Sequence, residues 1–189
     1  MLTLIAGLAL FLGVHSVSIV TPGGRDAAVQ RMGRGLWQGI YALIAIAGLI
    51  LIARGYAEVR NQTPILYLMP RWMHAISTTL MLPVFPLLLA AYLPGAIRTA
   101  VRHPMLVAVK LWAVAHLLAN GSLADVVLFG SVLAWAVADR ISLKRRVPRA
   151  VPAAPPGRYN DVIAIVGGLI LYGIMLHGGH GWLIGMPLV

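Results

Sequence analysis

The sequence predicts an all-α integral membrane protein, with one membrane domain over residues 1–189 built as a polytopic bundle of about six transmembrane helices. Two observations support this fold class. Hydrophobic residues make up 60% of the chain and its mean hydropathy is +0.87, whereas soluble domains are about 45–50% apolar. The apolar residues also form continuous blocks, without the period of an amphipathic helix or the alternation of a barrel strand.

Six apolar blocks are separated by polar, glycine-rich or proline-rich segments. They cover residues 2–20, 36–53, 72–93, 105–119, 123–138 and 162–176. Residues 21–24 contain a proline and paired glycines, which end the first helix. Pro83 and Pro86 each remove a backbone hydrogen bond, so they predict a kink in the third helix. Gly35 and Gly39 have the spacing that lets two membrane helices approach closely.

The fourth and fifth blocks predict a short helical hairpin. As an α-helix the fourth block would span about 22 Å, less than a hydrocarbon core of about 30 Å. Residues 120–122 (Asn-Gly-Ser) join it tightly to the fifth block. A proline-rich cytoplasmic linker is expected over residues 147–158, followed by a last helix over residues 160–178 and an apolar tail.

The net charge of +10 does not indicate nucleic-acid binding, because the basic residues lie between the apolar blocks and not along one face. Most of the 15 Lys and Arg follow the first, third and fifth blocks. The positive-inside rule therefore places those connections in the cytoplasm and both termini outside. The chain has no cysteine, which excludes disulfides, thiolate ligands and iron–sulfur clusters.

The carboxylates exclude several function classes. All five lie at or beyond the ends of the apolar blocks: Asp26, Glu58, Asp125, Asp139 and Asp161. A proton pump or cation carrier usually needs an acidic side chain at membrane depth. A hydrolase with paired carboxylates is equally unsupported.

Two histidines inside apolar blocks are the strongest candidates for a site. His15 lies in the first block and His116 in the fourth, where a titratable side chain is costly and therefore suggests a function. Two imidazoles from facing helices suit a haem iron. The simpler alternative role for His15 and for His116 is a hydrogen bond to a neighbouring helix. By depth, His74 and His177 are alternates to His15 as the second ligand.

Two neighbours of His116 share its helical face. Trp112 precedes it by one turn and Asn120 follows it by one turn. Trp112 could form a wall for a macrocycle and Asn120 could orient the imidazole, although such a face more often serves helix packing. His177 and His180 fall in the glycine-rich tail and are expected at the membrane interface.

Residues 102–104 (Arg-His-Pro) form the sharpest local motif. Pro104 is acceptable in the first turn of a helix, and the helix dipole there favours an anionic group beside Arg98 and Arg102. We therefore count Arg102 and His103 as candidate cofactor-binding residues. The alternative is a basic helix start at the cytoplasmic interface.

These motifs resemble the NnrU family of membrane proteins, which includes bacterial proteins linked to denitrification and the plant 15-cis-zeta-carotene isomerase. The resemblance covers a core of about residues 1–146. It is carried by Gly13-Val14-His15-Ser16, Arg102-His103-Pro104-Met105-Leu106-Val107, Leu111-Trp112-Ala113-Val114-Ala115-His116, Asn120-Gly121, Ala134-Trp135 and Asp139-Arg140. It implies a haem b buried in the bundle, with His15 and His116 as iron ligands. The isomerase has a cysteine at the position of Ala113, so a thiol ligand is excluded here.

A wider resemblance concerns isoprenylcysteine carboxyl methyltransferases, which also begin a membrane helix with Arg-His-Pro. It implies a membrane methyltransferase that uses S-adenosylmethionine, with Arg102 and His103 at the cofactor carboxylate. However, the tyrosine and glycine that usually follow are Leu106 and Ala108 here.

The leading hypothesis is a multi-pass protein of the bacterial inner membrane with periplasmic termini that binds haem b. The NnrU resemblance links it to nitrogen-oxide metabolism and to redox-gated, isomerase-like chemistry on a lipophilic substrate. Two alternatives stay open at this point: the S-adenosylmethionine-dependent methyltransferase and a non-enzymatic membrane accessory protein. Its expected partners are the lipid bilayer and a lipophilic small molecule.

Overall fold

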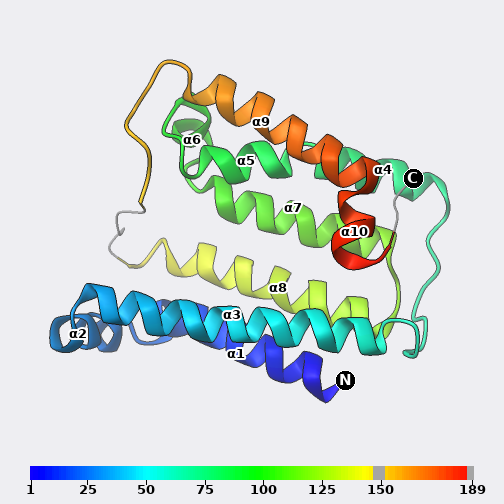
Figure 1. Ribbon diagram of the computed structural model, residues 1–189, viewed down its shortest axis with the longest axis horizontal. Helices are drawn as coiled ribbons and strands as arrows, with labels where there is room; N and C mark the ends of the chain where they lie inside the picture. The colour runs from blue at the N-terminus through cyan, green and yellow to red at the C-terminus, as the bar shows by residue number, and fades with distance from the viewer. Residues whose placement is uncertain (147–151, 187–189) are drawn as a thin grey trace. The chain divides into compact units, whose positions relative to one another are not determined.

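The computed structural model describes residues 1–146 and 152–186, and over these residues the chain is built from helices (Figure 1). Residues 147–151 of the predicted linker lie outside the described residues. The helices are α1 (Leu2–Val20), α2 (Pro22–Met32), α3 (Arg34–Val59), α4 (Trp72–Met81), α5 (Val84–Ala90), α6 (Ala96–Val101), α7 (Pro104–Ala119), α8 (Leu123–Ser142), α9 (Asn160–Ile174), a π-helical segment η1 (Met175–Gly179) and α10 (His180–Ile184). The predicted all-α class is confirmed.

Four helical stretches of the described chain are long and apolar enough to cross a membrane. They are Leu2–Val20, Arg34–Val59, Trp72–Ala90 and Asn160–Ile184. Helix α7 is a shorter apolar helix, and α8 carries Asp125 in its first turn and Arg140 in its last. Every predicted apolar block therefore forms helix, and the chain is a helical membrane protein.

The predicted kink in the third block is confirmed. Helix α4 ends at Met81 and α5 begins at Val84. Pro83 has no backbone N–H to donate, so the regular hydrogen-bond ladder cannot continue through it.

The chain divides into two compact units. Unit 1 comprises Met1–Leu68 and Gly121–Pro148, and unit 2 comprises Met69–Asn120 and Arg149–Val189. The boundary between Asn120 and Gly121 assigns α7 to unit 2 and α8 to unit 1. Each helix of the predicted hairpin therefore packs within its own unit: α7 against α4 and α5, and α8 against α1 and α3.

Unit 1 is held together by a close approach of α1 and α3. A Cβ atom on Gly48 would lie 2.8 Å from the backbone nitrogen of Phe11, and one on Gly7 would lie 2.5 Å from that of Ile52. Glycine at these positions therefore lets the two backbones touch. By contrast, Gly35 and Gly39 face open space, so the predicted small-residue pair does not form this contact.

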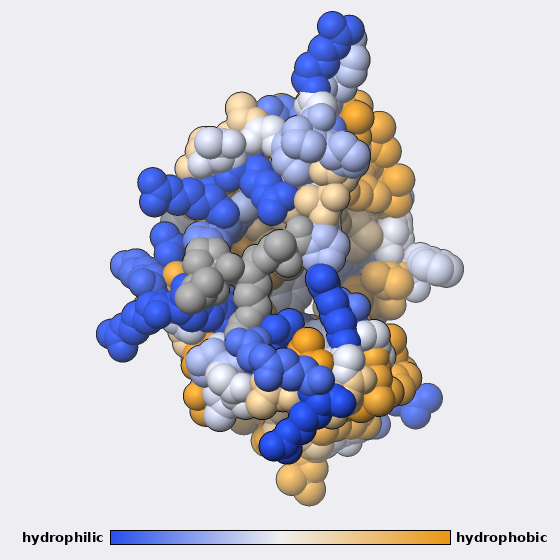
Figure 2. All heavy atoms as spheres, turned by 90° about the vertical axis from the view of Figure 1, so that its left-hand side faces the viewer, coloured by the Kyte–Doolittle hydropathy of each residue, from blue (hydrophilic) through white to orange (hydrophobic). Residues whose placement is uncertain are grey.

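On the outer surface of unit 1, hydrophilic and hydrophobic side chains occupy different areas. Over its α2 end, hydrophilic side chains gather on the face towards the viewer, while hydrophobic side chains cover the adjoining flank (Figure 2). Exposed aliphatic side chains on α3 include Leu43, Ile46 and Leu49. A helix end that meets water and a flank that meets lipid explain this pattern.

Unit 2 packs α5 against both α7 and α9. Its buried cluster consists of Val84, Leu87 and Ala108, and the side chain of Trp112 packs against it. The hydroxyl of Ser77 on α4 donates a hydrogen bond to the carbonyl of Ala115 at 2.6 Å. This bond fixes α4 on α7 one residue before His116.

A buried carboxylate lies in the first turn of α8. Asp125 is only 6% exposed, and its Oδ2 accepts hydrogen bonds from the backbone N–H of Ser122 (2.9 Å) and from the Ser122 hydroxyl (2.6 Å). The hydroxyl of Tyr56 donates to Oδ1 at 2.5 Å. Asp125 therefore has a structural role: it forms a capping box with the N-cap residue Ser122, and through Tyr56 it joins α3 to α8.

Replacing Asp125 by alanine should lower the free energy of unfolding by about 2–3 kcal/mol, since it breaks the capping box and leaves the partly buried Tyr56 hydroxyl without this acceptor. Thermal unfolding in detergent, followed by circular dichroism, measures the change. Glu58→Ala is the control, because Glu58 is an exposed carboxylate. Equal unfolding midpoints for the two variants would contradict the assignment.

Candidate functional site

His15 is held in a fixed orientation within α1. Its Nδ1 lies 2.6 Å from the carbonyl oxygen of Phe11, one turn earlier. A carbonyl oxygen can only accept a hydrogen bond, so Nδ1 carries the proton and Nε2 carries the lone pair. Nε2 is therefore the nitrogen that a metal would bind.

Aromatic rings from the three packed helices of unit 1 surround His15. The ring centroids of Phe11 on α1, Tyr41 on α3 and Trp135 on α8 lie 4.3, 5.2 and 5.7 Å from that of His15. Tyr41 and Trp135 both approach edge-on. The histidine therefore lies where the three helices meet, in a setting of flat aromatic surfaces.

Trp135 adds an unusual polar group to this setting. Its indole Nε1 is buried and has no hydrogen-bond partner in the described part of the chain. A buried N–H without an acceptor costs about 1–3 kcal/mol. Such a donor beside His15 suits a ligand that brings a carbonyl or carboxylate oxygen.

His116 on α7 repeats the arrangement of His15. Its Nδ1 lies 2.8 Å from the carbonyl oxygen of Trp112, and the two rings are 4.9 Å apart. The amide of Asn120 donates to the backbone carbonyl of His116 at 3.1 Å, so this bond caps the end of α7. Ala113 and Ala115 are fully buried and pack α7 into unit 2.

The histidine that the structure places beside His116 in unit 2 is His180. The two ring centroids are 6.4 Å apart and the ring planes are inclined by 30°. The alternates predicted from the sequence, His74 and His177, are exposed side chains. Sequence reasoning placed His180 at the membrane interface and therefore missed this pair.

A break in helical geometry carries the chain to His180. Within η1, Gly178 adopts a φ of +143°, which L side chains rarely adopt. His180 then starts α10, and its Nδ1 lies 2.7 Å from the carbonyl oxygen of Met186. The pair Gly178-Gly179 directly before His180 was the signal in the sequence for this bend.

The motif at residues 102–104 forms a strained turn between α6 and α7. Arg102 is the single non-glycine residue of the described chain with a positive φ, at +62°. The N–H of His103 donates to the carbonyl of Val101 at 2.7 Å, which closes a γ-turn around Arg102. Pro104 begins α7, as predicted. The side chain of Arg102 is exposed.

The donor set restricts which metals the chain can bind. Among the described residues, no group of three or more His, Asp or Glu could hold a bare metal ion. A metal that already sits in a macrocycle needs only one or two axial ligands from the protein. His15 and His116, each with Nδ1 bonded to a backbone carbonyl, fit that need. His15 belongs to unit 1 and His116 to unit 2.

Comparison with known proteins identifies the family. No curated protein and no solved structure matches this chain. The family model described as NnrU protein matches residues 3–188. This range includes His15 and His116, and it extends past residue 146 to the segment that carries His180. With nearly the whole chain covered, the protein belongs to the NnrU family.

Proposed function

We propose that this protein binds haem b in the membrane, with His15 and His116 as the axial ligands of the iron. One observation carries the proposal. Both histidines lie in apolar helices, and each has its Nδ1 hydrogen-bonded to the carbonyl four residues earlier. This bond fixes the tautomer and raises the basicity of Nε2, as the outer-shell partner of a metal-binding histidine does.

The surroundings of both histidines suit a porphyrin. Phe11, Tyr41 and Trp135 offer apolar ring surfaces around His15, and Trp112 does so beside His116. These rings would exclude water from the iron, and the buried indole N–H of Trp135 would donate to a polar group of the ligand. Bound haem would supply one-electron redox chemistry.

For location and role, the proposal follows the family and the charge pattern. Most of the Lys and Arg follow α1, α5 and α8, which supports a bacterial inner-membrane protein with periplasmic termini. NnrU membership supports a link to denitrification and nitrogen-oxide metabolism. Redox-gated, isomerase-like chemistry on a lipophilic substrate is the proposed reaction class.

The absorption spectrum of the detergent-purified protein, with its pyridine haemochromogen, tests the proposal. We expect a Soret band and haem of the b type at about one per chain. The double variant His15→Ala, His116→Ala should lose the band. A wild-type protein without haem, or a band unchanged in the double variant, would reject the proposal.

The contact between His116 and His180 makes the identity of the second ligand a separate question. We expect His180→Ala to keep the low-spin spectrum, whereas the haem that remains in His15→Ala should be high-spin, because a five-coordinate iron lacks one strong axial field. His177→Ala is the matched control, since His177 is exposed on the same bend. The opposite result for His15→Ala and His180→Ala would replace His15 by His180 as the second ligand.

A further inference from the structure

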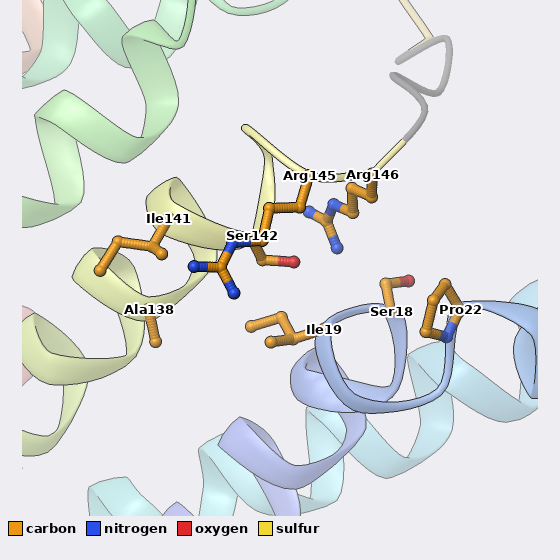
Figure 3. A pocket seen from close by; sticks show the side chains of 8 residues that line it. All are labelled: Ser18, Ile19, Pro22, Ala138, Ile141, Ser142, Arg145 and Arg146. Carbon is orange, nitrogen blue, oxygen red and sulfur yellow. The ribbon is translucent and has the colours of Figure 1, made fainter.

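An open hollow lies in unit 1 where the end of α1 meets the end of α8 (Figure 3). Its volume is about 310 Å³. The side chains that give it chemical character are Ser18 and Ile19 of α1, Ile141 and Ser142 of α8, and Arg145 and Arg146 of the turn after α8. Two cations, two hydroxyls and two aliphatic side chains therefore line one small cavity. The haem proposal uses none of these residues.

The arginines are the dominant charges of the hollow. Figure 3 shows the Arg146 guanidinium pointing towards Ser18 at the end of α1, and the Arg145 side chain running back along α8 with its guanidinium beside Ser142. Nη2 of Arg146 pairs with Asp139 Oδ1 at 2.6 Å, which neutralises one charge and fixes that side chain. In the described part of the chain, Arg145 forms no salt bridge, so its charge is not compensated there.

Arg146 also retains an unused hydrogen-bond donor. Its side chain is only 17% exposed, and its Nη1 is buried without a hydrogen-bond partner among the described residues. A guanidinium held in place by one carboxylate and still carrying a buried donor is prepared for an anionic acceptor. The hydroxyls of Ser18 and Ser142 line the same hollow and can also donate.

The apolar part of the lining decides the type of anion. Ile19 and Ile141 lie beside the charged groups, and Ile141 is 49% exposed. A free inorganic anion gains nothing from such surfaces, whereas a lipid places a phosphate and an aliphatic chain side by side. The hollow lies where two apolar helices end among basic residues, the level at which lipid head groups meet a membrane protein.

From these observations we propose that the hollow binds the phosphate of an anionic phospholipid, with Arg145 and Arg146 on the phosphate and Ile19 and Ile141 against the upper acyl chain. Arginine suits this role because its planar guanidinium can hold two phosphate oxygens at once. The lipid would fasten the end of α1 to the end of α8, both elements of unit 1.

Isothermal titration of the detergent-purified full chain with short-chain phosphatidylglycerol tests this proposal. Arg145→Gln should raise the Kd at least about tenfold, the effect of losing one hydrogen bond to a charged group. Lys144→Gln is the matched control, because it removes the same charge from the adjacent residue, which does not line the hollow. Its Kd should equal that of the wild type.

Arg146→Gln would leave Asp139 without its partner, so the double variant Asp139→Asn, Arg146→Gln is used to keep the pair neutral. It should also bind the lipid at least about tenfold more weakly.

Short-chain phosphatidylcholine and inorganic phosphate serve as separate ligands. Equal Kd values for Arg145→Gln and Lys144→Gln would overturn the proposal. Binding of inorganic phosphate as tight as that of phosphatidylglycerol would show a phosphate-ion site and would also overturn it. Neither readout depends on haem.

Discussion

His116→Ala is expected to purify with its helices intact and with its haem content lowered by at least about tenfold. Even indirect partners of a metal ligand change affinity by about 10–100-fold, so loss of an axial nitrogen should cost no less. Because His116 follows the fully buried Ala115 and the Ser77 hydrogen bond to its carbonyl, α7 should stay in place without the imidazole. The pyridine haemochromogen measures haem per chain, and circular dichroism reports the helix content.

His74→Ala is the control for this variant, since His74 is an exposed histidine of the same unit. It should keep the wild-type haem content. If both variants retained haem equally, His116 would have only the structural role of a helix-packing side chain. Loss of helix together with haem in His116→Ala would be resolved by His116→Gln, which keeps a polar side chain of similar reach but supplies no imidazole.

Gly48→Leu is expected to destabilise unit 1 by about 3 kcal/mol, near the upper end of the cost of overpacking. A side chain at Gly48 would meet the backbone of Phe11 at 2.8 Å, and backbone cannot move aside as a flexible side chain can. The carbonyl of Phe11 also holds the His15 imidazole. The same substitution should therefore lower both the unfolding midpoint and the haem content.

Gly39→Leu provides the comparison, because it places the same side chain on the same helix in open space. Thermal unfolding in detergent should show a lowered midpoint for Gly48→Leu and an almost unchanged one for Gly39→Leu. If the two midpoints fell by the same amount, the close packing of α1 on α3 would not be the source of stability described above.

The sequence predicted the elements of this fold well, because local chemistry determines them. Continuous apolar blocks gave the helices, Pro83 gave the break between α4 and α5, and Pro104 gave the start of α7. The assignment of α7 and α8 to different units was not predictable, since a tight link such as residues 120–122 does not determine which neighbours each helix packs against. Likewise, Gly35 and Gly39 have the expected spacing, but only tertiary packing selects Gly48 for the contact with α1.

The candidate site was predictable only in part. His15 and His116 were identified because a titratable group in an apolar helix is conspicuous in the sequence alone. The rings of Tyr41 and Trp135 around His15 come from two other helices, and no spacing rule links residues so far apart in the chain. His180 was missed because its position depends on the positive φ of Gly178, a backbone feature that a pattern of apolar residues does not reveal.

Electron paramagnetic resonance of the ferric protein is the most direct test of the central claim that His15 and His116 are axial ligands of a haem iron. We predict a low-spin signal typical of two imidazole ligands in the wild type, and its loss in both His15→Ala and His116→Ala. A wild-type protein with only a high-spin signal, or a low-spin signal that persists when both histidines are replaced, would contradict the claim.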